Sequence, residues 1–249
     1  MVAFGNPLGD FKLSVSANSC QDSNDVFPDT SSFKRVLFMS FSHSSSSLPS
    51  VPHAAQKNSD ILVRLREQTR AEHAAIEQTL DILNSAMTPA AYRRILERFY
   101  GFYQPLELKL RGMAGVLSAG LELDRREKTA LLGRDLSVLG RDPASLALSD
   151  QLPAVDGVPE ALGCLYCLEG ATLGGQIISR HLRKHLSITP ANGGGFFHGY
   201  GEQTGDMWKK FKVELGAVAM NPQEQARVVE AARATFHTLG LWCQKGLVP

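Results

Sequence analysis

Three residues in the segment 65–77 have the types and spacing of a metal-binding helix face. His73 is flanked by small residues, which leave room around its imidazole ring, a common metal ligand. Glu77 lies one helical turn later, where its carboxylate can accept the second ring N–H and fix the tautomer that binds a metal. Arg66 lies seven residues before His73, roughly 10 Å along a helix axis, a distance that suits a charge at the rim of a ligand. The alternative is a surface histidine with an ordinary i,i+4 carboxylate partner.

A second unusual stretch is the segment 163–186, whose helical periodicity is interrupted only by glycines. Gly170, Gly174 and Gly175 together give up about 3 kcal/mol of helix preference, at roughly 1 kcal/mol each. At about 100° per residue, Gly163, Gly170 and Gly174 fall on one face of the helix. Such a face either packs closely against another helix or lets a flat ligand lie against the backbone.

The two stretches together have the features of a haem pocket. An axial imidazole on one helix and bare backbone on another form its two faces, and His73 and the glycine stretch supply them. The sequence therefore predicts a haem site between these segments. A helical interaction domain without a cofactor is the simplest alternative.

The elements that must position these residues are predicted to be helices. Helix formers, caps and breakers indicate six of them, covering residues 60–83, a segment from Pro89 past Phe102, 124–139, 163–186, a segment from Thr204 and a segment from Pro222. Thr88 and Asn221 each precede a proline and suit the N-cap position. The stretch 189–203 is too rich in glycine to be helical. Because no stretch alternates as a strand does, we predict a single all-α, multi-helix domain.

The composition excludes several classes of protein. The chain is 43% apolar and 20% charged with a net charge of +1, which is typical of a globular protein and offers no basic block for nucleic acid. No apolar run approaches 18 residues, so we predict no membrane span. Four cysteines are too few for a disulfide framework, which favours a reducing compartment, and we expect the cytoplasm.

The first 58 residues differ from the rest of the chain. Thirteen of the first fifty are serine, and neither helical nor strand periodicity is sustained. We therefore predict a disordered tail over residues 1–58 and a helical domain over residues 59–249. The tail lacks the apolar core of a secretory signal and the acid-poor composition of a transit peptide. Met39 is an alternative start of the chain.

Two motifs resemble those of a known family. The segment 65–77 (LREQTRAEHAAIE) resembles the proximal-helix motif of the haem oxygenases, and the segment 170–176 (GATLGGQ) resembles their glycine-rich distal helix. The segments LYCLEG at 165–170, FFHGYG at 196–201 and TGDMW at 204–208 resemble the bacterial members associated with bacteriophytochromes. The resemblance covers about residues 60–245 and leaves the tail unexplained.

This resemblance implies an activity and a set of site residues. Haem would be both cofactor and substrate, opened by O2 and external electrons to biliverdin, CO and free iron. A reductase or ferredoxin would deliver the electrons, and a bacteriophytochrome would receive the biliverdin. His73 would be the axial ligand of the iron, and Gly170, Gly174 and Gly175 would be the distal glycines of the catalytic side. Further haem-binding contacts are expected from Arg66, Glu77, Lys209 and Lys212, of which the two lysines are placed only by their neighbourhood.

One position departs from the family pattern. Many members have an aspartate after the first distal glycine, where it organises water, whereas this chain has Ala171. Either another group holds the water or oxygen activation is weaker. The departure leaves open a haem-binding carrier or sensor that does not open the ring.

Two other groups have simpler interpretations. Cys164 and Cys167 form a C-x-x-C without the following histidine of covalent haem attachment, which favours a place in the core. His181 and His185 could bind zinc, but their basic neighbours favour a helix surface.

Overall fold

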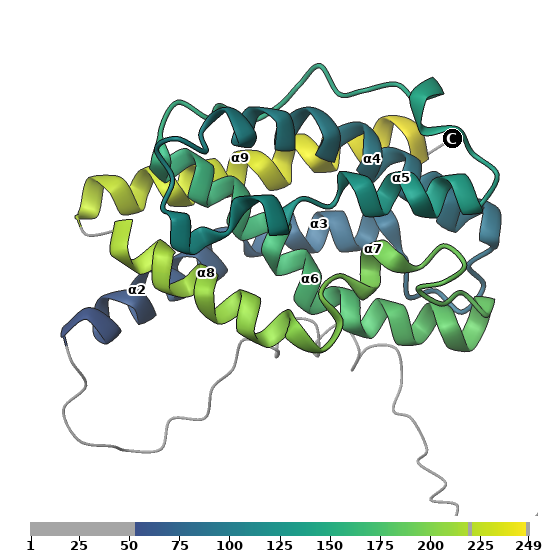
Figure 1. Ribbon diagram of the computed structural model, residues 1–249, viewed down its shortest axis with the longest axis horizontal. Coiled ribbons are helices and arrows are strands. Elements are labelled where there is room, and N and C mark those ends of the chain that lie inside the picture. Colours follow the sequence, from purple (N-terminus) through teal and green to yellow (C-terminus); the bar gives the residue numbers. More distant parts are fainter. Residues whose placement is uncertain (1–52, 219–220, 248–249) are drawn as a thin grey trace, which may run out of the picture. The chain divides into compact units, whose positions relative to one another are not determined.

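The computed structural model describes residues 53–218 and 221–247, and every regular element in this part of the chain is a helix (Figure 1). The α-helices are α2 (His53–Gln68), α3 (Arg70–Leu80), α4 (Pro89–Gly112), α5 (Thr129–Val138), α6 (Val158–Leu186), α7 (Gly195–His198), α8 (Thr204–Val218) and α9 (Pro222–Leu247). The 3-10 helices are η1 (Ala119–Leu121), η2 (Leu123–Arg126), η3 (Pro143–Ser145) and η4 (Gly201–Gln203). The all-α prediction is confirmed for the described residues. Of the predicted tail, residues 1–52 lie outside the described residues and 53–58 belong to α2.

The predicted helix starts follow from capping. The Thr88 hydroxyl accepts a hydrogen bond from the Ala91 N–H at 3.1 Å, and α4 continues through Pro105 to Gly112. The Asn221 side chain accepts from the Glu224 N–H at 2.8 Å and starts α9 in the same way. Each side chain satisfies a backbone donor that has no partner within its helix.

The predicted single helix over residues 60–83 is instead two helices, divided at Thr69. Thr69 has φ −101° and ψ 2°, and its hydroxyl donates to the Leu65 carbonyl at 2.7 Å. A threonine hydroxyl bonded to the carbonyl four residues earlier often bends a helix, and Thr69 is buried against the core. The second helix ends at Leu80, followed by Asp81 as C-cap with φ 41°, rather than at Leu83.

The predicted helix over residues 124–139 is also divided. A 3-10 turn ends at Arg126, α5 begins only at Thr129, and the Lys128 side chain between them is buried. The N–H groups of Lys128 and Thr129 donate to the Glu107 carboxylate at 2.7 and 3.0 Å. This carboxylate comes from α4, so tertiary contacts place the start of α5.

The stretch 189–203 contains the short helix α7, which the glycine content did not predict. The Asp135 carboxylate of α5 accepts from the N–H groups of Gly195 and Phe196 at 2.9 and 2.7 Å. It therefore caps α7 from sixty residues away in the chain, which local sequence patterns cannot indicate.

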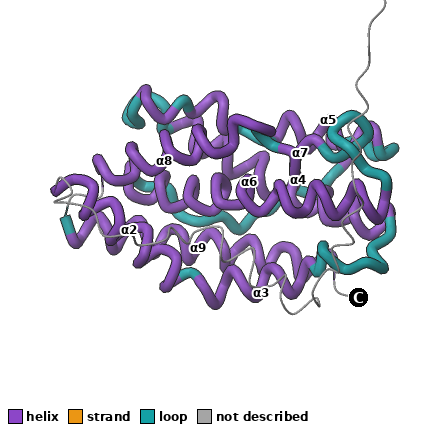
Figure 2. The backbone as a smooth tube through the Cα atoms, turned by 90° about the horizontal axis from the view of Figure 1, so that it is seen from below, coloured by secondary structure: helices purple, strands orange, loops and turns teal. Residues whose placement is uncertain are grey.

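Helix α9 is the helix against which several other helices pack. It packs against α6, α3, α4 and α2, and Figure 2 shows α2 and α3 lying along it. At Gly163 of α6, an added Cβ would lie 2.7 Å from the Ala231 Cβ and 2.9 Å from the Ala232 nitrogen, so only glycine allows this approach. The first half of α6 is thus a core helix pressed onto α9.

Helix α6 is also the one described helix that is long and apolar enough to cross a membrane by length and composition. In the structure, 67% of its apolar window is buried inside the protein. Burial in the core accounts for its apolar character.

Candidate functional site

His73 lies on α3 with one side of its ring against α9 and the other side partly exposed. Its Nδ1 is 3.6 Å from the Glu77 Oε1, and both side chains are 35% exposed. Its ring meets the Phe236 ring edge-on, with centroids 5.4 Å apart. Burial lowers the pKa of His73, which favours the neutral imidazole that ligates metals. Glu77 therefore lies beside His73 as predicted, but the distance is longer than that of the predicted hydrogen bond.

The glycines of α6 have different surroundings. Around Gly170, no described atom beyond its own helix lies within 4 Å of where a Cβ would be. Gly174 is half-buried and Ala171 is exposed, on the same side of the helix. Gly175 is tightly packed, because an added Cβ would lie 2.5 Å from the Phe197 carbonyl oxygen. Of the predicted glycines, Gly170 leaves backbone open, whereas Gly175 allows α7 to approach.

Phe236 and its neighbours on α9 connect the two segments. The Phe236 ring contacts His73 of α3, and its backbone lies beside the Cys167 thiol of α6. That thiol donates to the Ala232 carbonyl at 3.2 Å. Both α3 and α6 pack mainly on α9, so His73 and the turn that ends in Gly170 share one supporting helix.

Arg66 lies in the last turn of α2. Helix α2 packs against α8, which carries the two predicted lysines. The Arg66 charge lies beside the Tyr166 phenol, and the Tyr166 ring is 6.2 Å from the Trp208 ring of α8. Lys209 pairs with Asp206 at 3.1 Å, and both side chains are 75% exposed. The structure thus groups the helices that carry the predicted basic residues.

The lysines differ in exposure. Lys212 is half-buried, one turn after Trp208, whereas Lys209 extends into solvent. The two lysines therefore differ in how far they lie from the packed surface of α8.

A family model described as "Heme oxygenase" matches residues 59–245. The chain belongs to the haem oxygenase family. Membership makes the protein a haem oxygenase enzyme, which favours haem degradation over the carrier or sensor alternative. A comparison with curated proteins finds no match.

Solved haem oxygenases share the fold. The Neisseria meningitidis enzyme, determined with NO and CO bound, has a TM-score of 0.65 at 21% identity, covering 75% of this chain and 92% of that chain. The Leptospira interrogans enzyme has a TM-score of 0.61 at 18% identity, covering 74% and 98%. The cyanobacterial enzyme from Synechocystis, determined in complex with haem, has a TM-score of 0.62 at 15% identity, covering 74% and 91%.

Sequence reasoning missed a buried charge cluster in this haem oxygenase, made of Arg126, Lys128 and Glu169. Their side chains are 1%, 2% and 1% exposed. Arg126 donates to the Glu169 carboxylate, and the Lys128 Nζ is 3.8 Å from the Glu169 Oε1. The Tyr200 hydroxyl donates to the same oxygen at 2.7 Å. The only signal in the sequence was the position of Glu169, directly before Gly170.

Burial changes the pKa of one cation in this cluster. It lowers the pKa of Lys128 to about 8, while the nearby Glu169 charge acts in the opposite direction. The Lys128 Nζ also lies 3.7 Å from the centre of the Tyr200 ring, a cation–π contact that favours the charged amine. One carboxylate thus holds together groups from three separate segments.

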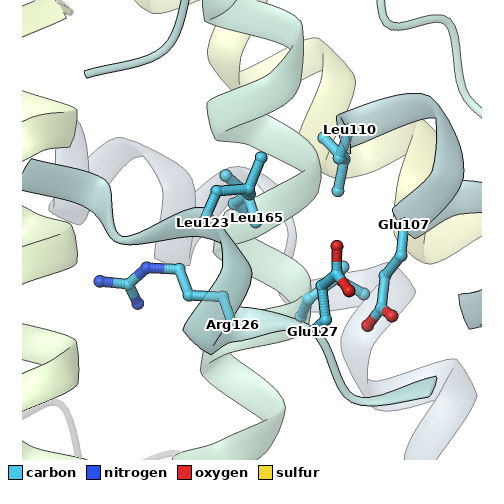
Figure 3. A pocket seen from close by; sticks show the side chains of 7 residues that line it. Glu107, Leu110, Leu123, Arg126, Glu127 and Leu165 are labelled. Carbon is cyan, nitrogen blue, oxygen red and sulfur yellow. The ribbon is translucent and has the colours of Figure 1, made fainter. Parts of the chain in front are cut away.

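A cavity of about 10 Å³ lies beside the cluster, between α4, η2 and α6 (Figure 3). Its lining combines the carboxyl groups of Glu107 and Glu127 with the leucine side chains Leu110, Leu123 and Leu165. This volume holds about one water molecule and no larger ligand. The cavity belongs to the buried cluster and includes none of the predicted haem contacts.

Proposed function

We propose that this haem oxygenase opens haem to biliverdin, CO and free iron, and that it supplies biliverdin to a bacteriophytochrome in the cytoplasm. Electrons come from a reductase or ferredoxin. The observation that carries the proposal is the pair formed by His73 and Gly170, a half-exposed imidazole and an open stretch of helix backbone supported by the same helix. The bacteriophytochrome rests on the sequence resemblance alone.

The residues of the chain fit haem on both faces. His73 would ligate the iron, and Glu77, with its Oε1 3.6 Å from the His73 Nδ1, would help to orient the ring. Gly170 would let the porphyrin approach the α6 backbone, with Gly174 one turn later on the same side, and Gly175 allows the close approach of α7. Arg66 and Lys212 bind the carboxylates of the haem edge, with Lys209 as an outer charge.

The haem iron supplies the redox chemistry when bound, and the protein supplies position and exclusion of water. Ala171 gives no polar side chain beside Gly170, so backbone groups and water would supply hydrogen bonds there. The Phe236 ring of α9 covers part of the His73 ring and shields that part from water.

Product analysis tests this function. We expect haem bound to the purified protein, given O2 and a reductant, to lose its Soret absorbance and yield biliverdin, CO and iron. The control is His73→Ala, which should bind haem with an altered Soret band and weaker affinity. Loss of the Soret band without a bilin product, or an identical spectrum and affinity in His73→Ala, would contradict the proposal.

A further inference from the structure

A face of α6 turned by about 100° from Gly170 is bound along two turns by polar groups from the segment 198–204. The Tyr200 hydroxyl donates to the Glu169 Oε1 at 2.7 Å. The Gln176 amide donates to the His198 carbonyl at 2.9 Å and to the Thr204 hydroxyl at 3.3 Å. We call this set of five residues, Glu169, Gln176, His198, Tyr200 and Thr204, the polar seam.

Helix geometry explains why the polar seam and the open backbone lie on different sides. At about 100° per residue, Gln176 falls within about 20° of Glu169 around the axis, whereas Gly170 is turned by about 100° and Gly174 by about 140°. The seam therefore holds α6 on a different side from the one on which Gly170 leaves the backbone open. On a third side of the helix, about 120° from Glu169, the Phe197 carbonyl packs against Gly175.

The anchor of the polar seam is itself fixed. Glu169 is 1% exposed and accepts from Arg126, whose guanidinium also donates to the carbonyls of Leu121 and Met207 at 2.5 and 3.2 Å. Moving Glu169 would leave buried charges without partners, which is costly. The carboxylate therefore limits movement of α6 along its axis and rotation about that axis at the residue before Gly170.

This part of α6 needs such support. Gly170, Gly174 and Gly175 lower its intrinsic helix stability, and no described atom of another element lies within 4 Å of where a Cβ at Gly170 would be. A segment with weak helix preference and few packing contacts opens locally more readily than a core helix. The hydrogen bonds of the polar seam therefore add to the packing of Thr172, Leu173 and Gly175 in holding this segment in place.

We propose that Glu169 and Gln176 are positioning residues, which hold the glycine turns of α6 through the polar seam so that the open backbone keeps a fixed place against the substrate. The proposal rests on the proposed function, because the open face matters for the reaction only if haem lies there. In this proposal neither Glu169 nor Gln176 contacts the reacting atoms of the substrate. Their effect is transmitted through the backbone of residues 170–176.

Hydrogen exchange of the haem-free protein tests the positioning directly. Tyr200→Phe removes one hydroxyl and keeps the ring over Lys128, and we expect about tenfold faster exchange confined to residues 170–176, as for loss of a hydrogen bond to a charged group. The matched control is Tyr92→Phe, because the Tyr92 hydroxyl donates to the Gly193 carbonyl at 2.8 Å on the other side of α7. Unchanged exchange at 170–176, or an equal rise in all helices, would overturn the proposal.

A second variant keeps the test independent of the buried charges. Gln176→Met preserves length and removes the amide, and it should also speed exchange at residues 170–176. In both variants we expect turnover to fall about tenfold while the haem Kd stays within about threefold of wild type, since His73 is untouched. Turnover that stays at the wild-type value would overturn the proposal. If the wild type binds haem without degrading it, the proposed function fails while the exchange result still decides whether the polar seam holds α6.

Discussion

Gly163 and Gly170 lie two turns apart on one helix, and the structure uses them for opposite purposes. Gly163 lets α9 approach until a methyl group would collide with its backbone, whereas Gly170 leaves the α6 backbone uncovered. The first half of α6 is held on several sides by apolar packing, and the glycine turns are held on one side by hydrogen bonds. Small residues on one helix face thus indicate a close approach without telling what approaches.

The largest expected effect that tests this contrast is the loss of turnover when Gly170 is substituted. Gly170→Leu places a branched side chain in the open space, where we expect turnover to fall roughly 100-fold or more, because a displaced substrate loses its productive geometry. The folded protein should survive, since no described neighbour lies within 4 Å of the new Cβ. The measurement is bilin formation in a single-turnover assay, with thermal unfolding of the haem-free variant as its control. Normal product formation would show that haem does not use this face.

A smaller effect distinguishes the two glycines by stability alone. Gly163→Ala should lower the free energy of unfolding by about 1–3 kcal/mol, because the methyl group forces α6 and α9 apart. Gly170→Ala should raise it by roughly 0.5–1 kcal/mol, because alanine has the higher helix preference and meets no neighbour. Urea unfolding of the haem-free proteins measures both. Changes of the same sign would remove the contrast between the two halves of α6.

The smallest expected effect concerns the pH dependence of His73. Because burial lowers the pKa of His73, the folded protein keeps the ring neutral below pH 6.5, and protonation favours the unfolded chain. Stability linked to this group is therefore complete above pH 6.5 and is lost as the pH falls through the lower folded pKa. Haem titrations between pH 5 and pH 7.5 should show axial ligation persisting below pH 6.5, with His73→Ala as the reference. Loss of ligation at pH 6.5 or above would contradict the environment assigned to His73.

Local patterns predicted much of the helical content and failed where distant groups act. The caps at Thr88 and Asn221 were predictable because each bonds within four residues along the chain. The late start of α5 and the existence of α7 were not, because Glu107 and Asp135 supply their caps from other helices. The division at Thr69 needed both a local hydroxyl bond and burial of that residue against the core.

The sequence alone determined the helices that carry His73 and the glycines, because helical periodicity and capping depend on neighbours in the chain. Tertiary structure decided which glycine is open and which is packed, since that depends on the surface of α9 and on the carbonyl of Phe197. It also decided that Glu169 is buried with Arg126 and Lys128 rather than exposed. The physical reason is range: hydrogen bonds along a helix follow the sequence, whereas packing and the pairing of buried charges depend on segments that only folding brings together.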